Sequence, residues 1–248
     1  MTPKTSHGAL PLPSRGFRAT GSIWRLPSPE RRRVIARVCR RLKAAYGMPR
    51  LGNPTDPLDD LVFVVLSGKT SPETASVVYE RLKSAFPAWD QMADSSLRRI
   101  EAILKPAGLS RVRGRNLLGT MRRLRADVGK CDLTVLRGAS LDIAFEYLVS
   151  LPGVSSKVAK CVMMYALGVQ VLPVDSHVHR VAARLGWTAR KRADQCDDEL
   201  QALVPPRMRL AFHVDCIAHG RAICRPTAPA CHRCPIHDDC PYVAARGR

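Results

Sequence analysis

The chain has 248 residues, enough to bury a hydrophobic core without the help of disulfide bonds. Its 40 Lys and Arg residues exceed its 21 Asp and Glu residues by 19, and an excess of this size favours a polyanionic partner, nucleic acid above all. Hydrophobic residues make up 46% of the chain and no apolar run reaches the roughly 20 residues of a membrane span, so the composition excludes a disordered chain and a membrane protein.

Residues 1–28 predict a flexible basic tail. They are rich in Pro, Ser, Thr and Gly, and they carry four basic side chains and no acidic one. Because they lack a continuous apolar core, they predict no secretory signal peptide. The absence of acidic residues leaves an organelle transit peptide as a minor alternative, which the prolines disfavour because they interrupt an amphipathic helix. We therefore expect an intracellular protein, cytoplasmic and nucleoid-associated if its source is prokaryotic.

Beyond the tail, the hydrophobic pattern is helical almost everywhere, which predicts an all-α fold. Ser28-Pro29-Glu30 is a helix start, and the helix that follows has one apolar face and ends at Gly47. The apolar run 61–66 predicts a buried central helix, because no partner strands or hairpin turns follow it. Further helices are predicted to start at Ser71 and at Ser95 or Ser96, to run over 113–124, to end near Ser150, to reach Gly168, and to follow Asp175.

A tight turn precedes one of these helices. Residues 151–157 read Leu-Pro-Gly-Val-Ser-Ser-Lys, and a Pro-Gly turn between two helices leaves backbone N–H groups unpaired at the start of the second helix. With the helix dipole, these groups predict a seat for a phosphate that reads no bases. Taken alone, such a corner is more often only structural, and Lys157 only a surface lysine.

Four of the nine cysteines fall in one segment, with the spacing Cys224-x6-Cys231-x2-Cys234-x5-Cys240. Four thiolates so spaced predict a metal site, since the odd number of cysteines and the predicted absence of a signal peptide argue against a disulfide scaffold. Both a tetrahedral zinc and an iron–sulfur cluster remain open on chemistry alone, although zinc fingers usually present two close pairs.

Lys157 and the segment Val174-Asp175-Ser176-His177 complete a larger motif. With the hairpin they resemble the helix-hairpin-helix DNA glycosylase superfamily, whose hairpin reads LPGVG and precedes a catalytic lysine and a catalytic aspartate. Lys157 and Asp175 occupy these positions, and their separation, 175 − 157 = 18 residues, fits the family. The cysteine spacing after His219-Gly220-Arg221 is similar to the [4Fe–4S] loop of the endonuclease III branch, so the resemblance implies this cluster as a cofactor on the four cysteines.

The resemblance also implies a two-lobed fold with a C-terminal iron–sulfur cluster loop. A six-helix barrel would cover residues 51–169 and contain the hairpin, and the cluster domain would cover residues 29–50 and 170–248. Duplex DNA containing damaged bases or abasic sites is the implied partner, lying across the cleft between the lobes. We expect a monomer without a membrane partner.

The implied activity is base excision repair by a bifunctional DNA glycosylase and AP lyase, which removes oxidised pyrimidines from duplex DNA and cleaves the abasic site by β-elimination. Lys157 would be the nucleophile and Asp175 its acidic partner, although Asp175 also fits a simple helix N-cap. The family fills the hole left by a flipped base from the positions of Lys69 and Leu109, and a helix-start contact is the alternative for Leu109. The phosphate-binding hairpin would consist of Pro152, Gly153, Val154 and Ser155.

Three departures from the family pattern leave other base specificities open. Ser155 stands where the hairpin has a second glycine, and it would be strained if that position needs a positive φ. Lys69 replaces a glutamine, and an ammonium group cannot accept a hydrogen bond from the orphaned base. The segment Val158 to Cys161 also resembles the oxoguanine branch. The mismatched-adenine branch is disfavoured, because it lacks the lysine and uses a carboxylate at the position of Phe63.

Two functions of other classes remain. One is a DNA- or abasic-site-binding protein with weak or no glycosylase activity, and the other is a zinc-binding regulator. For any DNA-binding function, the positive charge is expected on the tail, on the helix from Arg31 to Arg41, and on Arg111, Arg113 and Arg115, so that binding weakens steeply with salt.

Overall fold

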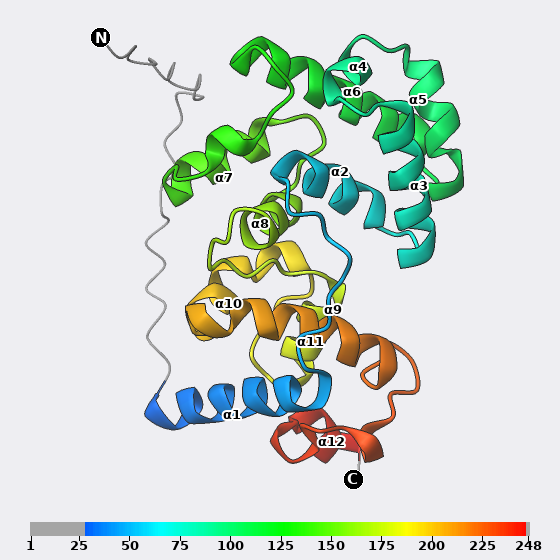
Figure 1. The fold of residues 1–248 in the computed structure, drawn as a ribbon. Helices are drawn as coiled ribbons and strands as arrows, with labels where there is room; N and C mark the ends of the chain where they lie inside the picture. Colours follow the sequence, from blue (N-terminus) through cyan, green and yellow to red (C-terminus); the bar gives the residue numbers. More distant parts are fainter. Residues whose placement is uncertain (1–27, 247–248) are drawn as a thin grey trace. The chain divides into compact units, whose positions relative to one another are not determined.

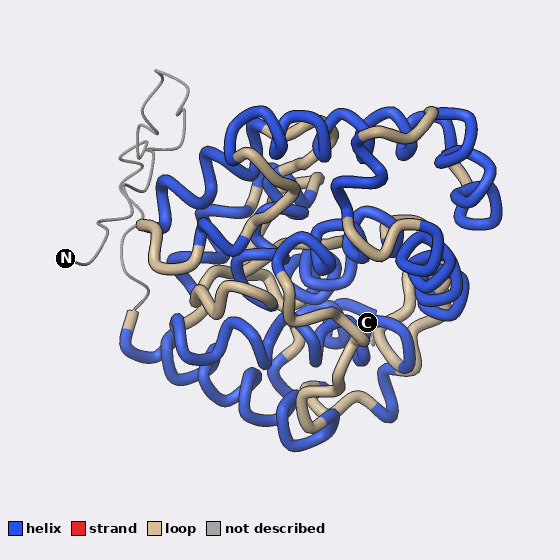
Figure 2. Tube along the Cα trace, turned by 45° about the horizontal axis from the view of Figure 1, so that its top comes forward, coloured by secondary structure: helices blue, strands red, loops and turns tan. Residues whose placement is uncertain are grey.

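The computed structural model describes residues 28–246, so the predicted tail lies outside the described residues except for Ser28. Within this range every regular element is an α- or 3-10 helix, and Figure 2 shows helices joined by loops, with no strand in the described part. The all-α prediction is confirmed there. None of the described helices is both long and apolar enough to cross a membrane.

The described chain forms two compact units, residues 54–155 and residues 28–53 with 156–246. The predicted division differs mainly at helix α8 (Ser156–Tyr165), which it placed with the first unit and which the structure groups with the second. Two polar contacts tie α8 to Asp197 within the second unit. Ser156 Oγ donates to its carboxylate at 2.7 Å, and Lys160 pairs with the same oxygen at 2.9 Å.

The first unit is organised around α2 (Pro57–Ser67), the predicted buried central helix. Asp56 caps its start, and apolar side chains on most sides of it, among them Leu61, Val62 and Leu66, are buried. A five-residue helix, α4, was not predicted, because it is too short to show a helical period. The other α-helices of this unit, labelled in Figure 1, are α3 (Pro72–Ala85), α4 (Trp89–Ala93), α5 (Leu97–Leu104), α6 (Ser110–Val128) and α7 (Leu141–Ser150). Two 3-10 helices, η1 (Lys105–Ala107) and η2 (Thr134–Leu136), complete it.

The second unit begins with α1 (Pro29–Tyr46), whose boundaries follow the sequence signals. The Ser28 Oγ accepts a hydrogen bond from the backbone N–H of Arg31 at 3.2 Å, and Gly47, with φ 68°, ends the helix. The remaining elements are α8, α9 (Ser176–Arg184), η3 (Ala193–Gln195), α10 (Asp197–Leu203), η4 (Pro206–Met208), α11 (Arg209–Ala222), η5 (Cys231–Arg233), η6 (His237–Asp239) and α12 (Pro241–Arg246).

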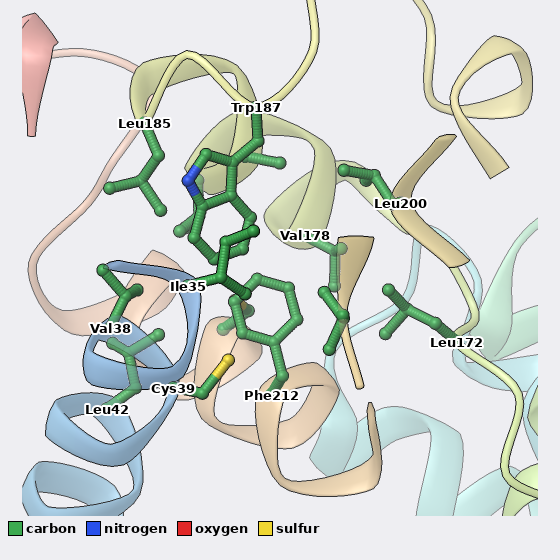
Figure 3. Packing of buried hydrophobic residues seen from close by; sticks show 14 of the residues in the cluster. Ile35, Val38, Cys39, Leu42, Leu172, Val178, Leu185, Trp187, Leu200 and Phe212 are labelled. Atoms are coloured by element: carbon green, nitrogen blue, oxygen red, sulfur yellow. The ribbon is translucent and has the colours of Figure 1, made fainter. Parts of the chain in front are cut away.

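The core of the second unit lies where α1, α9 and α11 pack together. Ile35, Val38 and Leu42 on the predicted apolar face of α1 are fully buried, and they lie beside Phe212 of α11 in Figure 3. Trp187 stacks on Phe212 with 5.4 Å between ring centroids. This core fixes the positions of α9, which Asp175 caps, and of α11, which ends just before the cysteine segment.

Candidate active site

Asp175 is the N-cap of α9. Its Oδ1 accepts hydrogen bonds from the backbone N–H groups of His177 and Val178, each at 2.8 Å, and the side chain is half-buried. The N-cap alternative considered from the sequence is therefore confirmed. It does not compete with a chemical role, because the two bonds hold the carboxylate in one orientation at the positive end of a helix.

Lys157 lies half-buried in the first turn of α8, and it shares a neighbour with Asp175. That neighbour is His213 of α11, which is buried and whose Nδ1 donates to Pro173 O at 2.9 Å. Burial holds the pKa of His213 well below its ordinary value; the charge of Asp175 opposes this effect and that of Lys157 adds to it. His213 is thus a neutral imidazole in electrostatic reach of both predicted catalytic groups.

His213 was not identified from the sequence. It belongs to no motif, and its link to Lys157 and Asp175 arises only because α11 packs against α9. Its ring meets Tyr165 of α8 edge-on, with 5.9 Å between centroids. A histidine on an apolar helix is by itself no signal for a site.

The hairpin turn belongs to the first unit and packs on α6. Gly153 has φ 76°, and a Cβ atom built there would lie 2.2 Å from Nδ2 and 2.8 Å from Cβ of Asn116. Thr120 Oγ1 donates to Pro152 O at 3.2 Å, and a Cβ on Gly119 would lie 3.2 Å from the Pro152 ring. The glycine at 153 is therefore required both by its backbone conformation and by the close approach of α6.

The hairpin exposes its polar edge. Leu151 and Val154 are buried, whereas Pro152, Gly153 and Ser155 are exposed. Ser155 is not among the non-glycine residues with positive φ, so the strain considered for a serine at this position is absent. The phosphate-binding role of the hairpin remains a prediction.

Lys69 and Leu109, the predicted hole-filling residues, occupy two loops of the first unit. Both have left-handed backbones, with φ 59° and 52°, and both side chains are exposed, Leu109 at 60%. Leu109 sits at the N-cap position of α6, so the helix-start alternative for this residue also stays open. The prediction that Arg113 belongs to the exposed basic surface is wrong, because its side chain is buried among loop carbonyls.

All four clustered cysteines line one apolar pocket of the second unit, together with side chains such as Leu185, Ile223 and Ile236. Burial raises the pKa of Cys234 to about 11 and also raises that of Cys240, which favours the neutral thiol at these two positions unless a positively charged group binds. Among residues 28–246 no group of His, Cys, Asp and Glu side chains lies so that it could hold a metal ion. The shared pocket and its donor set of four thiols nevertheless fit a cluster with four thiolate ligands.

Basic side chains surround this pocket. Arg184 NH1 donates to Cys224 Sγ at 3.1 Å, and its guanidinium lies over the ring of Tyr242 at 4.4 Å. His219 contacts Cys234 Sγ through Nε2 at 3.7 Å and Tyr46 Oη through Nδ1 at 2.8 Å. Positive charge and N–H donors beside the sulfur atoms favour anionic thiolates.

Two of the arginines expected to face DNA pair with acids of the cysteine segment. Arg37 of α1 forms an ion pair with Asp239, the residue before Cys240, and Arg41 reaches both Asp238 and Asp239 at 3.3 Å. The exposed arginines of α1 available to a partner are therefore Arg31, Arg32, Arg33 and Arg40.

Solved structures of an endonuclease III and of a DNA glycosylase resemble the chain. An endonuclease III in a non-covalent complex with DNA matches 88% of this chain and 98% of its own at a TM-score of 0.75 and 24% sequence identity. A thermostable thymine-DNA glycosylase matches 87% of this chain and 98% of its own at a TM-score of 0.71 and 21% identity. At these identities the likeness establishes the fold.

Curated relatives and a family comparison extend the likeness to sequence. Endonuclease III of Thermotoga maritima is 26% identical over 81% of this chain and 90% of its own length, and that of Synechocystis is 30% identical over 76% and 83%. Residues 62–206 match the family described as "HhH-GPD superfamily base excision DNA repair protein", where HhH denotes the helix-hairpin-helix. The resemblance inferred from the hairpin, the lysine and the aspartate is thus confirmed, and the chain belongs to the HhH-GPD superfamily of base excision DNA repair glycosylases.

Proposed function

We propose that this glycosylase is bifunctional, removing oxidised pyrimidines from duplex DNA and then cleaving the abasic site by β-elimination. The observation that supports the proposal is Asp175, held by two backbone N–H groups in the same unit as Lys157, with the charges of both residues acting on His213. The endonuclease III names of two curated relatives support the substrate class.

Excision begins with rotation of the damaged nucleotide out of the base stack, which costs a few kcal/mol. The neutral amine of Lys157 attacks C1′, so that a C–N bond forms while the glycosidic bond breaks and the base leaves with its electron pair and a proton. Opening of the sugar ring gives an imine between Lys157 and the former C1′. Loss of a C2′ proton then expels the 3′ phosphate and cuts the strand.

Asp175 orients Lys157 or takes its proton, and its negative charge stabilises the cationic sugar in the transition state. Because Oδ1 accepts both N–H groups at the helix N-terminus, Oδ2 is the oxygen assigned to this work. His213 contributes no charge of its own, since it stays neutral. A cationic imidazole there would disfavour positive charge on the sugar.

DNA contacts are assigned to three exposed features. The hairpin Pro152–Ser155 would hold a phosphate beside the lesion, and Lys69 and Leu109 would fill the hole left by the flipped nucleotide. A lysine in place of the family's glutamine favours a purine acceptor, N7 or O6, on the orphaned base. The [4Fe–4S] cluster would be held by Cys224, Cys231, Cys234 and Cys240, where it would crosslink the segment rather than act on DNA.

Borohydride reduction tests the nucleophile, because it converts the imine into a stable covalent bond. The wild-type protein should become covalently attached to duplex DNA containing an abasic site, whereas Lys157→Ala should not. Lys191→Ala, which removes an exposed lysine of the same unit, is the matched control and should be trapped normally. Trapping that survives Lys157→Ala refutes the nucleophile.

Substrate and cofactor need separate measurements. A panel of duplexes carrying thymine glycol, oxoguanine, mismatched adenine or uracil identifies the base removed, and excision confined to a base other than thymine glycol refutes the oxidised-pyrimidine assignment. DNA binding without excision or nicking would indicate a binding protein. Purified protein should contain about four iron atoms per chain, and zinc without iron would refute the cluster.

A further inference from the structure

Arg113 of α6 is buried in the first unit, with 6% of its surface exposed. Its NH1 donates to Ala107 O at 2.7 Å, to Gly108 O at 3.2 Å and to Thr70 Oγ1 at 3.1 Å, and its NH2 donates to Gly68 O. Among the described residues, the hydrogen-bond acceptors of Arg113 are thus carbonyl groups and one hydroxyl, and no carboxylate. A guanidinium buried without a counter-ion is costly, and burial accordingly lowers its pKa.

These acceptors belong to two loops that are far apart in sequence. Gly68 and Thr70 lie between α2 and α3, whereas Ala107 and Gly108 lie between α5 and α6. Thr70 Oγ1 adds a direct bridge, since its hydroxyl donates to Ala107 O at 3.0 Å. One side chain and one hydroxyl therefore tie the two loops together.

Lys69 and Leu109 stand at the centre of these two loops, each beside residues that Arg113 holds. Left-handed backbone at a non-glycine residue costs on the order of 1–2 kcal/mol, and it persists only where the surroundings over-determine it. Arg113 supplies that determination by binding a carbonyl of each loop, while the side chains of Lys69 and Leu109 remain exposed.

We propose that Arg113, assisted by Thr70, locks the Lys69 and Leu109 loops into a single rigid probe, so that both side chains enter the DNA helix as a pair. This rests on the proposed function, which assigns the two side chains to the hole left by a flipped nucleotide. Arg113 is a positioning residue: it touches neither the reacting atoms nor the DNA, and it acts through the loops that it joins. Without Arg113 the two loops move independently, and the conformational entropy lost when DNA orders them weakens binding.

The test is equilibrium binding of the full chain to a duplex containing one tetrahydrofuran abasic analogue and to the same duplex intact. The ratio of the two affinities reports hole filling without chemistry, because the analogue has neither a base to remove nor a C1′ that can form an imine. We expect the wild type to prefer the analogue by about tenfold and Arg113→Met to prefer it by about twofold or less. Arg113→Lys should recover part of the preference, since it can bind one of the loops.

Two further variants separate positioning from general damage. Arg111→Met removes an exposed arginine of the same helix and should weaken binding to both duplexes while leaving their ratio unchanged. In a Leu109→Ala background, Arg113→Met should have little additional effect, because the pair is already broken. Thermal unfolding verifies that each variant is folded, and Thr70→Val, which removes only the bridging hydroxyl, should lower the ratio by about threefold if Arg113→Met does not fold.

The outcomes are distinct. The proposal is overturned if the wild type shows no preference for the analogue, if folded Arg113→Met keeps the full preference, or if the effects of Leu109→Ala and Arg113→Met add. Thr70→Val with the wild-type ratio overturns it where Arg113→Met does not fold. Failure of borohydride trapping with a preserved binding ratio counts against the proposed catalysis and leaves the role of Arg113 supported.

Discussion

Replacing Gly153 by alanine adds a single methyl group at the turn of the hairpin, where two costs combine. The first is conformational: φ 76° is left-handed, and an alanine there costs on the order of 1 kcal/mol. The second is steric, because the new Cβ would lie 2.2 Å from Nδ2 and 2.8 Å from Cβ of Asn116. The amide can rotate away, but the Asn116 Cβ is fixed by the backbone of α6. Overpacking of this kind costs about 1–3 kcal/mol.

We therefore expect Gly153→Ala to lower the free energy of unfolding by about 2–4 kcal/mol, a large fraction of the stability of a typical domain. Urea unfolding followed by circular dichroism measures this change. The matched control is Gly129→Ala at the end of α6, where φ is 83° and no atom lies within 4 Å of a new Cβ. That variant carries only the conformational cost and should lose about 1 kcal/mol.

A double mutant isolates the steric part. Asn116→Gly removes the atoms that the new methyl group meets, at a cost of about 1 kcal/mol for glycine inside a helix. Gly153→Ala combined with Asn116→Gly should lose at least about 1 kcal/mol less than the sum of the two single changes. Additive losses, or a Gly153→Ala variant no less stable than Gly129→Ala, would refute the close approach of the hairpin to α6.

Two further predictions concern the second unit. Gly220→Ala would place a Cβ 2.3 Å from His177 Nδ1 and 2.8 Å from NH2 of Arg180, and the Nε of Arg180 donates to Cys224 O at 2.7 Å. We expect the free energy of unfolding in urea to fall by about 1–3 kcal/mol and the iron content per chain to decrease. Full iron content at wild-type stability would contradict this. His213 has a lowered pKa when folded, so below pH 6.5 the unfolded chain binds a proton that the folded chain does not, and stability falls as the pH decreases towards the folded pKa by up to about 1.4 kcal/mol per pH unit. His213→Asn should show a smaller drop in urea midpoint between pH 7 and 5.5, and an unchanged pH dependence would contradict the neutral imidazole. The charges of Asp175, Lys157 and His177 also act on this group and remain in the variant.

Local signals identified most helices of the first unit and α1, α8 and α9 of the second, whereas α10, α11 and α12 were not predicted. The Ser28 cap, the Gly47 stop and the apolar face between them define α1, because capping and periodicity depend on residues within a few positions. The start of α3 at Ser71 and of α5 at Ser96 follows from the same side-chain caps. The missed helix α4 has no side-chain hydrogen bond at its N-cap and only five residues, so it offers no such signal.

The candidate chemistry was likewise identifiable from the sequence, because the hairpin, Lys157, Asp175 and the four cysteines form short motifs with fixed spacings. The surroundings of these groups were not. Arg113, Arg37 and Arg41 all count as positive charges in the sequence, yet the fold buries the first between two loops and pairs the others with the acids before Cys240. Which arginines remain available to bind DNA therefore depends on the hydrogen-bond and ion-pair partners that the fold places beside them.

Most of the helices, the superfamily and the residues nominated for catalysis could be predicted from short-range order along the chain, whereas α4, α10, α11 and α12 were not. Only packing settled that Ser155 is unstrained, that α8 is anchored to Asp197, that the charges of Lys157 and Asp175 both act on His213, and that Arg113 joins the Lys69 and Leu109 loops. The interactions of Asp197, His213 and Arg113 join residues on separate elements, and the conformation of Ser155 is selected by packing. Such features leave no pattern in the sequence.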